Sequence, residues 1–246
     1  HTAANNFRGE LGLPGHNFGS YMQAVNQIPT LYGFSPRVVP PPSDWDSDAY
    51  VTGYWFLDEH PGWQPPDDLA AFLGNGDPPI YVGFGSMPSG DPQATHDLIL
   101  AALEQAGVRG VIGKGWSGAV ERRTHDFAYY LDYAPHEWLF ERVAAVVHHG
   151  GAGTTAAGLR AGKPAMIVPH LGDQPYWARR VYELGVGAKP VTRHALTIEK
   201  LASGMRQITS DAAMQRKAAE LGAHIRSENG IENAVKLIEE ISGRKL

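Results

Sequence analysis

The chain has 246 residues, of which 43% are hydrophobic and 19% charged, and its formal net charge is −5 at pH 7. This length fits one large domain, or one domain with part of another. The acidic balance argues against the basic surface typical of nucleic-acid-binding proteins. The absence of cysteine excludes disulfides and thiolate metal sites. No apolar run approaches the ~20 residues of a membrane-spanning helix, so we expect a cytoplasmic globular protein.

The first 78 residues fall into two stretches. Residues 1–28 begin with neither an initiator Met nor the apolar core of a signal peptide. Residues 29–78 are rich in proline, including Pro40-Pro41-Pro42 and Pro65-Pro66. Proline fixes φ and removes a backbone donor, so we expect this stretch to be extended and loop-like rather than helical, as a linker would be.

From residue 79 onward, short apolar runs alternate with amphipathic segments. The runs that predict buried strands are Ile80–Phe84, Gly110–Ile112, Ala128–Leu131, Val143–His148 and Ala165–Val168. The segments that predict helices are Pro92–Gln105, Thr154–Ala161 and Asp173–Leu184, and the C-terminal third has helical spacing throughout.

This alternation predicts βαβ units and therefore an α/β fold. We expect a Rossmann-like parallel sheet flanked by helices over residues 79–230, followed by a C-terminal helix at 231–246. Such sheets bind ligands at the carboxyl ends of their strands. The loops at Gly85, Tyr133, His149 and His170 are therefore expected to face one crevice.

The segment His148–Thr155 reads HHGGAGTT and joins an expected strand to an expected helix. Glycines let backbone N–H groups approach a ligand, and a helix N-terminus adds further donors with a partial positive charge, which together favour a phosphate. His149, Thr154 and Thr155 add side-chain donors. A plain strand–helix turn with Thr154 as the N-cap is the alternative interpretation.

Two other loops carry candidate ligand-binding groups. Ser86 follows the first expected strand and offers a second phosphate contact, or belongs to a close-packed turn. Asp173 and Gln174 lie just beyond another strand, where their side chains can accept from and donate to sugar hydroxyls; an N-cap role for Asp173 is the alternative. The spacing of the histidines and carboxylates specifies no metal site, and none is expected.

The same turn also satisfies the G-x-G-x-x-G/A pattern of dinucleotide binding, at Gly151, Gly153 and Ala156. Asp173 lies near the place where a ribose-binding acid belongs in such a site. An NAD-binding oxidoreductase domain is therefore an alternative hypothesis. Against it, a first βα unit already occurs at residues 80–105, and a dinucleotide turn does not require two imidazoles.

Together, the glycine-rich turn and the Asp-Gln pair resemble the donor-binding signature of the UDP-glycosyltransferase superfamily, whose members have the GT-B fold. Its sterol 3β-glucosyltransferase and bacterial natural-product branch typically reads HHGGAGTT, then RAGxP, then GDQPxW. This chain matches those motifs at His148–Thr155, Arg160–Pro164 and Gly172–Trp177. The resemblance spans residues 28–190, including the proline-rich stretch, which is similar to that branch's interdomain linker.

By position, the resemblance implies roles for particular residues. The donor diphosphate is expected at Ser86, His149, Gly151, Gly153, Thr154 and Thr155. The nucleobase is expected at Tyr133 and His136, and the hexose at Asp173 and Gln174. Ala157 stands where many relatives have a Glu that contacts the ribose, and Glu137 is a candidate substitute.

The resemblance implies the donor-binding half of an inverting hexosyltransferase that uses no metal or other cofactor. It would transfer a hexose, expected to be glucose, from a UDP-sugar to a hydroxyl of a lipophilic acceptor such as a sterol or polyketide. The catalytic base is expected in an N-terminal acceptor domain of which residues 1–28 are the tail. Expected partners are the nucleotide sugar, the acceptor, that N-terminal domain and, at most, a membrane surface in peripheral contact. A third hypothesis is a binding-only module that captures nucleotide sugar for another subunit.

Overall fold

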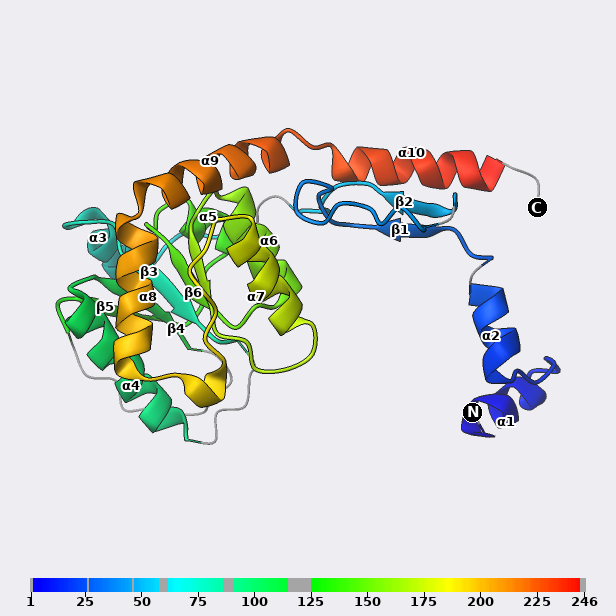
Figure 1. Ribbon diagram of the computed structural model, residues 1–246, viewed down its shortest axis with the longest axis horizontal. Coiled ribbons are helices and arrows are strands. Elements are labelled where there is room, and N and C mark those ends of the chain that lie inside the picture. The colour runs from blue at the N-terminus through cyan, green and yellow to red at the C-terminus, as the bar shows by residue number, and fades with distance from the viewer. Residues whose placement is uncertain are drawn as a thin grey trace. The chain divides into compact units, whose positions relative to one another are not determined.

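A computed structural model describes residues 2–25, 27–45, 47–57, 62–85, 91–114 and 125–243. The chain divides into two compact units, one made of His1–Trp55 with Asn229–Leu246 and the other of Phe56–Glu228. The larger unit contains the sheet and all the loops expected to bind a ligand (Figure 1).

The larger unit is built on a five-stranded parallel sheet with the strand order β5-β4-β3-β6-β7. The strands are β3 (Ile80–Gly83), β4 (Gly110–Gly113), β5 (Ala128–Leu131), β6 (Val146–His148) and β7 (Ala165–Ile167). Each strand coincides with all or part of one of the predicted apolar runs. Strands that are covered on both faces need apolar side chains on both faces. The predicted α/β fold with a parallel sheet is confirmed.

Helices cover both faces of this sheet (Figure 1). Alternate strand residues point to opposite faces, so Ile80 and Val82 pack in a core with α4 (Pro92–Ala106) and α8 (Ile198–Ser210). Tyr81 between them packs in a second core on the other face. The elements that meet Tyr81 there include α3 (Asp67–Gly74), α5 (His136–Phe140) and α6 (Ala152–Arg160). The remaining helices of this unit are α7 (Gln174–Glu183), η1 (Arg193–Ala195) and α9 (Ala212–Arg226).

The smaller unit contains a two-stranded parallel sheet and three helices in its described residues. These elements are α1 (Thr2–Glu10), α2 (Phe18–Val25), β1 (Thr30–Tyr32), β2 (Ala49–Val51) and α10 (Gly230–Gly243). The start of α10 packs tightly, because a Cβ on Gly230 would lie 2.2 Å from the carbonyl oxygen of Tyr54. The Asn233 side chain also donates to the carbonyl of Thr52 over 3.0 Å. The roles of residues 1–28 and 29–78, as the tail of another domain and a linker, remain predictions.

The expectation that residues 29–78 contain no helix is wrong, because α3 occupies Asp67–Gly74. Pro66 lies at its N-cap and accepts the first backbone hydrogen bond from Ala70. Proline is tolerated there because the first N–H groups of a helix have no partner within it. The proline pair at 65 and 66 therefore marks the start of a helix.

Helix α6 begins at Ala152, two residues earlier than predicted, with Gly151 as its N-cap. The alternative interpretation with Thr154 as the N-cap is therefore wrong. Thr154 instead lies in the first helical turn. The hydroxyl and the N–H of Thr155 both donate to the carbonyl of Gly151, each over 2.9 Å.

Candidate functional site

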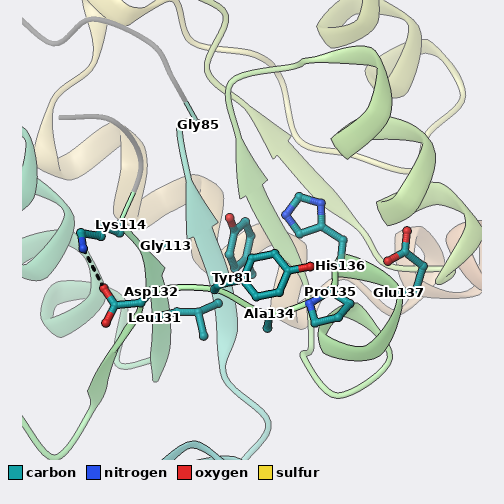
Figure 2. Close-up of a pocket in the computed structure, with 11 residues that line it drawn as sticks. Tyr81, Gly85, Gly113, Lys114, Leu131, Asp132, Ala134, Pro135, His136 and Glu137 are labelled. Atoms are coloured by element: carbon teal, nitrogen blue, oxygen red, sulfur yellow. Dashed lines mark ion pairs between the residues drawn. The ribbon is translucent and has the colours of Figure 1, made fainter. Parts of the chain in front are cut away.

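A cavity of about 330 Å³ opens at the carboxyl edge of the sheet, on the side of β4 and β5 (Figure 2). Its described lining comes from the loops that follow β3, β4 and β5, with the Tyr81 ring between them. The lining residues are Tyr81, Gly85, Gly113, Lys114, Leu131, Asp132, Tyr133, Ala134, Pro135, His136 and Glu137. Of the four loops that the sequence placed at one crevice, those at Gly85 and Tyr133 line this cavity, whereas His149 and His170 are not among its lining residues.

The imidazole of His149 lies between two glycines next to this cavity. A Cβ on Gly85 would be 2.9 Å from its Cε1 atom, and a Cβ on Gly151 would be 2.6 Å from its Nε2 atom. Both distances are shorter than real Cβ contacts allow, so a larger residue at either position would displace the ring. The absence of a side chain at these two glycines leaves space for the His149 ring. The interpretation of the segment as a phosphate turn did not predict this steric role.

Burial lowers the pKa of His149, while the backbone of Gly83 and the carboxylate of Asp173 act in the opposite direction. Among the described residues, its buried Nδ1 atom has no hydrogen-bond partner of good geometry. His149 is therefore a neutral imidazole near pH 7 with unused hydrogen-bonding capacity.

His148 differs sharply from its neighbour. It is buried, and its Nδ1 atom accepts a hydrogen bond from the N–H of Gly150 over 3.1 Å. Burial, followed by the nearby rings of His149 and His136, lowers its pKa to about 3. Sequence reasoning used both imidazoles as an argument against a dinucleotide turn. In the structure, His148 instead supports the turn as a hydrogen-bond acceptor that is neutral at pH 7.

The N-terminus of α6 forms the other side of the turn. The N-cap residue Gly151 has no side chain that could cap the helix, and the first N–H groups of any helix lack partners within it. At Gly153, no described atom lies within 4 Å of where a Cβ would be, so this face of the helix is open. Thr155 faces inward with both donors used, so the structure gives it no donor for a diphosphate.

Asp173 and Gln174 stand at the start of α7 in different environments. Asp173 is exposed, accepts a hydrogen bond from the Trp177 indole over 2.8 Å, and is close enough to His149 to influence its pKa. Gln174 is buried, and its side-chain oxygen accepts from the N–H groups of His170 and Leu171 over 2.7 and 3.1 Å. Gln174 therefore shapes the loop that carries Asp173.

The two expected nucleobase residues both line the cavity. Tyr133 is 57% exposed and presents a ring to solvent. His136 stacks on Phe140 with ring centres 4.6 Å apart. Its pKa is lowered by burial, raised by Glu137 and lowered further by His149. Ser86 lies outside the described residues.

The fourth predicted loop also reaches this edge of the sheet. The His170 ring lies 5.6 Å from the ring of Phe84, and its Nδ1 atom is 2.9 Å from the carbonyl of Val168.

Sequence reasoning did not single out Tyr81, Lys114 or Asp132. A polar residue directly after a strand was an available signal for Lys114 and Asp132, because the carboxyl ends of neighbouring parallel strands meet at one edge.

Comparisons with known proteins show which family the chain resembles in sequence and in fold. A family model, described as the C-terminal domain of erythromycin biosynthesis protein CIII-like proteins, matches residues 126–241. A sterol 3-beta-glucosyltransferase of Arabidopsis thaliana is 41% identical over 238 residues, which are 95% of this chain and 38% of that protein. The O-mycaminosyltylonolide 6-deoxyallosyltransferase of Streptomyces fradiae is also 41% identical, over 96% of this chain and 55% of that protein. The chain is the C-terminal domain of a GT-B glycosyltransferase.

Solved glycosyltransferase structures share the fold of this GT-B domain. The glycotransferase of kitacinnamycin superposes with a TM-score of 0.75 at 21% identity, covering 96% of this chain and 60% of that one. CalG4, the calicheamicin glycosyltransferase, superposes with a TM-score of 0.68 at 20% identity, covering 99% and 59%. The sequence identities relate this GT-B domain to sterol 3-beta-glucosyltransferases and to Streptomyces natural-product glycosyltransferases, and the chain spans only part of their length.

Two features are absent from the described part of the GT-B domain and its flanking unit. No three His, Asp or Glu side chains there gather closely enough to hold a metal ion. No helix there is both long and apolar enough to cross a membrane.

Proposed function

We propose that this domain binds the nucleoside diphosphate of a UDP-sugar. In the complete enzyme, the hexose, which we take to be glucose, passes to a hydroxyl of a lipophilic acceptor such as a sterol or polyketide. The observation that carries the proposal is the imidazole of His149, held between Gly85 and Gly151 beside the uncapped N-terminus of α6.

This arrangement suits a diphosphate because all its groups can act as donors toward an anion. The first-turn N–H groups of α6 point out of the helix with the positive end of its dipole. His149 adds a neutral imidazole whose protonation a nearby phosphate would favour. Of the two threonines, Thr154 is the better candidate for a hydroxyl contact, since Thr155 already donates to Gly151.

The sugar is proposed to lie against α7. The exposed carboxylate of Asp173 can accept hydrogen bonds from hexose hydroxyls. Gln174 supports this contact by fixing the backbone of His170 and Leu171, and is proposed as a positioning residue. The nucleobase then occupies the cavity beside Tyr133 and His136.

The proposed reaction is a direct displacement with inversion at the anomeric carbon. The acceptor oxygen forms a bond to that carbon while the bond to the diphosphate oxygen breaks, and a base outside this chain takes the hydroxyl proton. Negative charge develops on the leaving diphosphate. Fixed N–H donors and His149 would stabilise that charge without reorganising, which is the usual origin of large rate effects in such sites.

The substitution His149→Ala in the intact enzyme tests this assignment. We expect turnover to fall by about 10²- to 10³-fold, the usual effect of losing one donor to a developing anion. The unfolding midpoint should change little, because the buried Nδ1 atom of the ring makes no well-formed hydrogen bond to any described residue. His224→Ala, which removes an exposed histidine on α9, is the matched control and should keep normal turnover. Near-normal turnover of His149→Ala would contradict the proposal.

A further inference from the structure

The larger unit has a second hollow, of about 730 Å³, which is lined by α5, α6 and the segment 62–65. We name it the α5–α6 groove. Its lining includes Ala157 and Ala161, which lie one turn apart on α6. Because these side chains are small, they leave space beside α6 that larger ones would fill. A volume of this size is typical of sites for small molecules.

Two indole rings lie together in the α5–α6 groove. Trp63 and Trp138 meet edge to face, with ring centres 4.9 Å apart. Both residues are only half-buried, although a tryptophan gains much from full burial because of its large apolar ring. The groove therefore favours a ligand with a flat or apolar body that covers the indoles further.

Three arginines from different helices also line the groove, and rings and carbonyls fix their positions. The Arg142 guanidinium lies 4.3 Å from the ring centre of Trp138, and its Nη1 atom donates to the carbonyl of that residue over 2.7 Å. The Arg160 guanidinium lies 4.3 Å from the ring centre of Phe56. Arg226, at the end of α9, donates to the carbonyl of Arg160.

Part of this arrangement serves the helices. Arg142 and Arg226 donate to carbonyls near the C-terminal ends of α5 and α6, where positive charge is favourable. A bond to a carbonyl uses one of the five N–H donors of a guanidinium and leaves its charge in place. Helix capping therefore explains single arginines, but it does not require that three of them line one hollow.

The groove also contains two carboxylates, Glu137 and Glu141. Glu141 lies 3.6 Å from Nη1 of Arg142. It also acts on a second cation, because burial lowers the pKa of Lys163 and Glu141 raises it. The described lining thus holds three arginines against two glutamates, one of which two cations share. This local excess of positive charge occurs in a chain whose net charge is −5.

We propose that the α5–α6 groove is a second ligand site, which binds a phosphate monoester carried on a flat ring. The phosphate oxygens accept hydrogen bonds from Arg142 and Arg160, because guanidinium groups match phosphate geometry. The ring lies against the indoles of Trp63 and Trp138. The arginines lie toward the C-terminal end of α6, about 12 Å along the helix from its first residue. The site is therefore separate from the diphosphate site proposed at the N-terminus of α6, and it does not depend on that proposal.

Nuclear magnetic resonance titration of the ¹⁵N-labelled 246-residue chain with phenyl phosphate tests this site. We expect saturable shifts of the indole N–H signals of Trp63 and Trp138, which the variants Trp63→Phe and Trp138→Phe assign. Arg160→Gln and Arg142→Gln should each weaken phenyl phosphate about tenfold, through loss of hydrogen bonds to a charged group. Both variants should bind UDP as the wild type does.

Matched controls separate the site from general charge effects. Arg216→Gln removes an exposed arginine of α9, about 15 Å along the helix from Arg226, and should bind phenyl phosphate normally. Inorganic phosphate should bind more weakly than phenyl phosphate because it lacks the ring. Benzylamine, which has the ring but a positive charge, should not bind. Thermal unfolding checks each variant, and Arg142→Gln decides if Arg160→Gln does not fold.

Three results would overturn the inference. These are indole signals that phenyl phosphate does not move, equal phenyl phosphate affinities in the wild type and the two arginine variants, and tighter binding of benzylamine than of phenyl phosphate. The last would show that Glu137 and Glu141 set the charge preference of the groove. Failure of the chain to bind UDP would contradict the proposed function alone.

Discussion

At the residue scale, two adjacent histidines have different environments because one ends strand β6 and the other lies beyond it. His148 is the last residue of β6 and is buried, whereas His149 projects beyond the strand between Gly85 and Gly151. From its place in the turn, the sequence could predict that His149 lies at the candidate site. It could not separate the two rings, since their burial depends on the packing of neighbouring strands.

The buried neutral His148 should make stability depend on pH. Its pKa is about 3 in the folded chain and ~6.5 when unfolded, so between these values the unfolded state binds the extra proton. Its contribution to stability is therefore complete above pH 6.5 and is lost as pH falls toward 3.

We expect His148→Asn to reduce this dependence. The Asn side chain can still accept from Gly150 but does not titrate, so the pH slope of the unfolding free energy should fall by about 1.4 kcal/mol per pH unit, the value for one proton. Denaturant unfolding at several pH values from 4 to 7 measures this slope. His136, His149 and His170 also have lowered pKa values and keep part of the dependence in the variant. Identical slopes in variant and wild type would contradict the assignment.

At the element scale, strand positions could be predicted more reliably than strand limits. Buried parallel strands need apolar residues, so each apolar run identified a strand. The run Val143–His148 begins three residues before β6, because Val143 and Ala145 are buried in the cores without belonging to the strand. Helix α3 was missed since proline composition was taken to exclude helix, although Pro66 only precedes it.

The start of α6 offers a steric test of the turn. A Cβ on Gly151 would lie 2.6 Å from the His149 ring, whereas a Cβ on Gly153 would meet no described atom within 4 Å. We expect Gly151→Ala to lower the unfolding free energy by about 1–3 kcal/mol through overpacking. Gly153→Ala should leave it unchanged or raise it by about 0.5–1 kcal/mol, because alanine is the better helix former. Urea denaturation of both variants measures these changes. Equal changes in unfolding free energy would show that Gly151 does not confine the His149 ring.

At the scale of the whole molecule, the βαβ alternation was enough to predict the parallel sheet and the sheet edge that carries the candidate site. It could not predict which strand ends and side chains line the cavity, because that depends on the strand order and on where Tyr81 and Lys114 point. Motif spacing indicated the GT-B family, and relatives 41% identical over most of the chain bear this out. The acceptor and the catalytic base belong to the proposal for the complete enzyme.

The central claim is that the turn around His149 binds a nucleoside diphosphate, and the glycine pattern that it shares with dinucleotide sites makes NAD the informative competitor. Calorimetric titration of the 246-residue chain with UDP and, separately, with NAD tests it most directly. The structure predicts saturable binding of UDP that His149→Ala weakens, and no measurable binding of NAD. Binding of NAD without binding of UDP would contradict it.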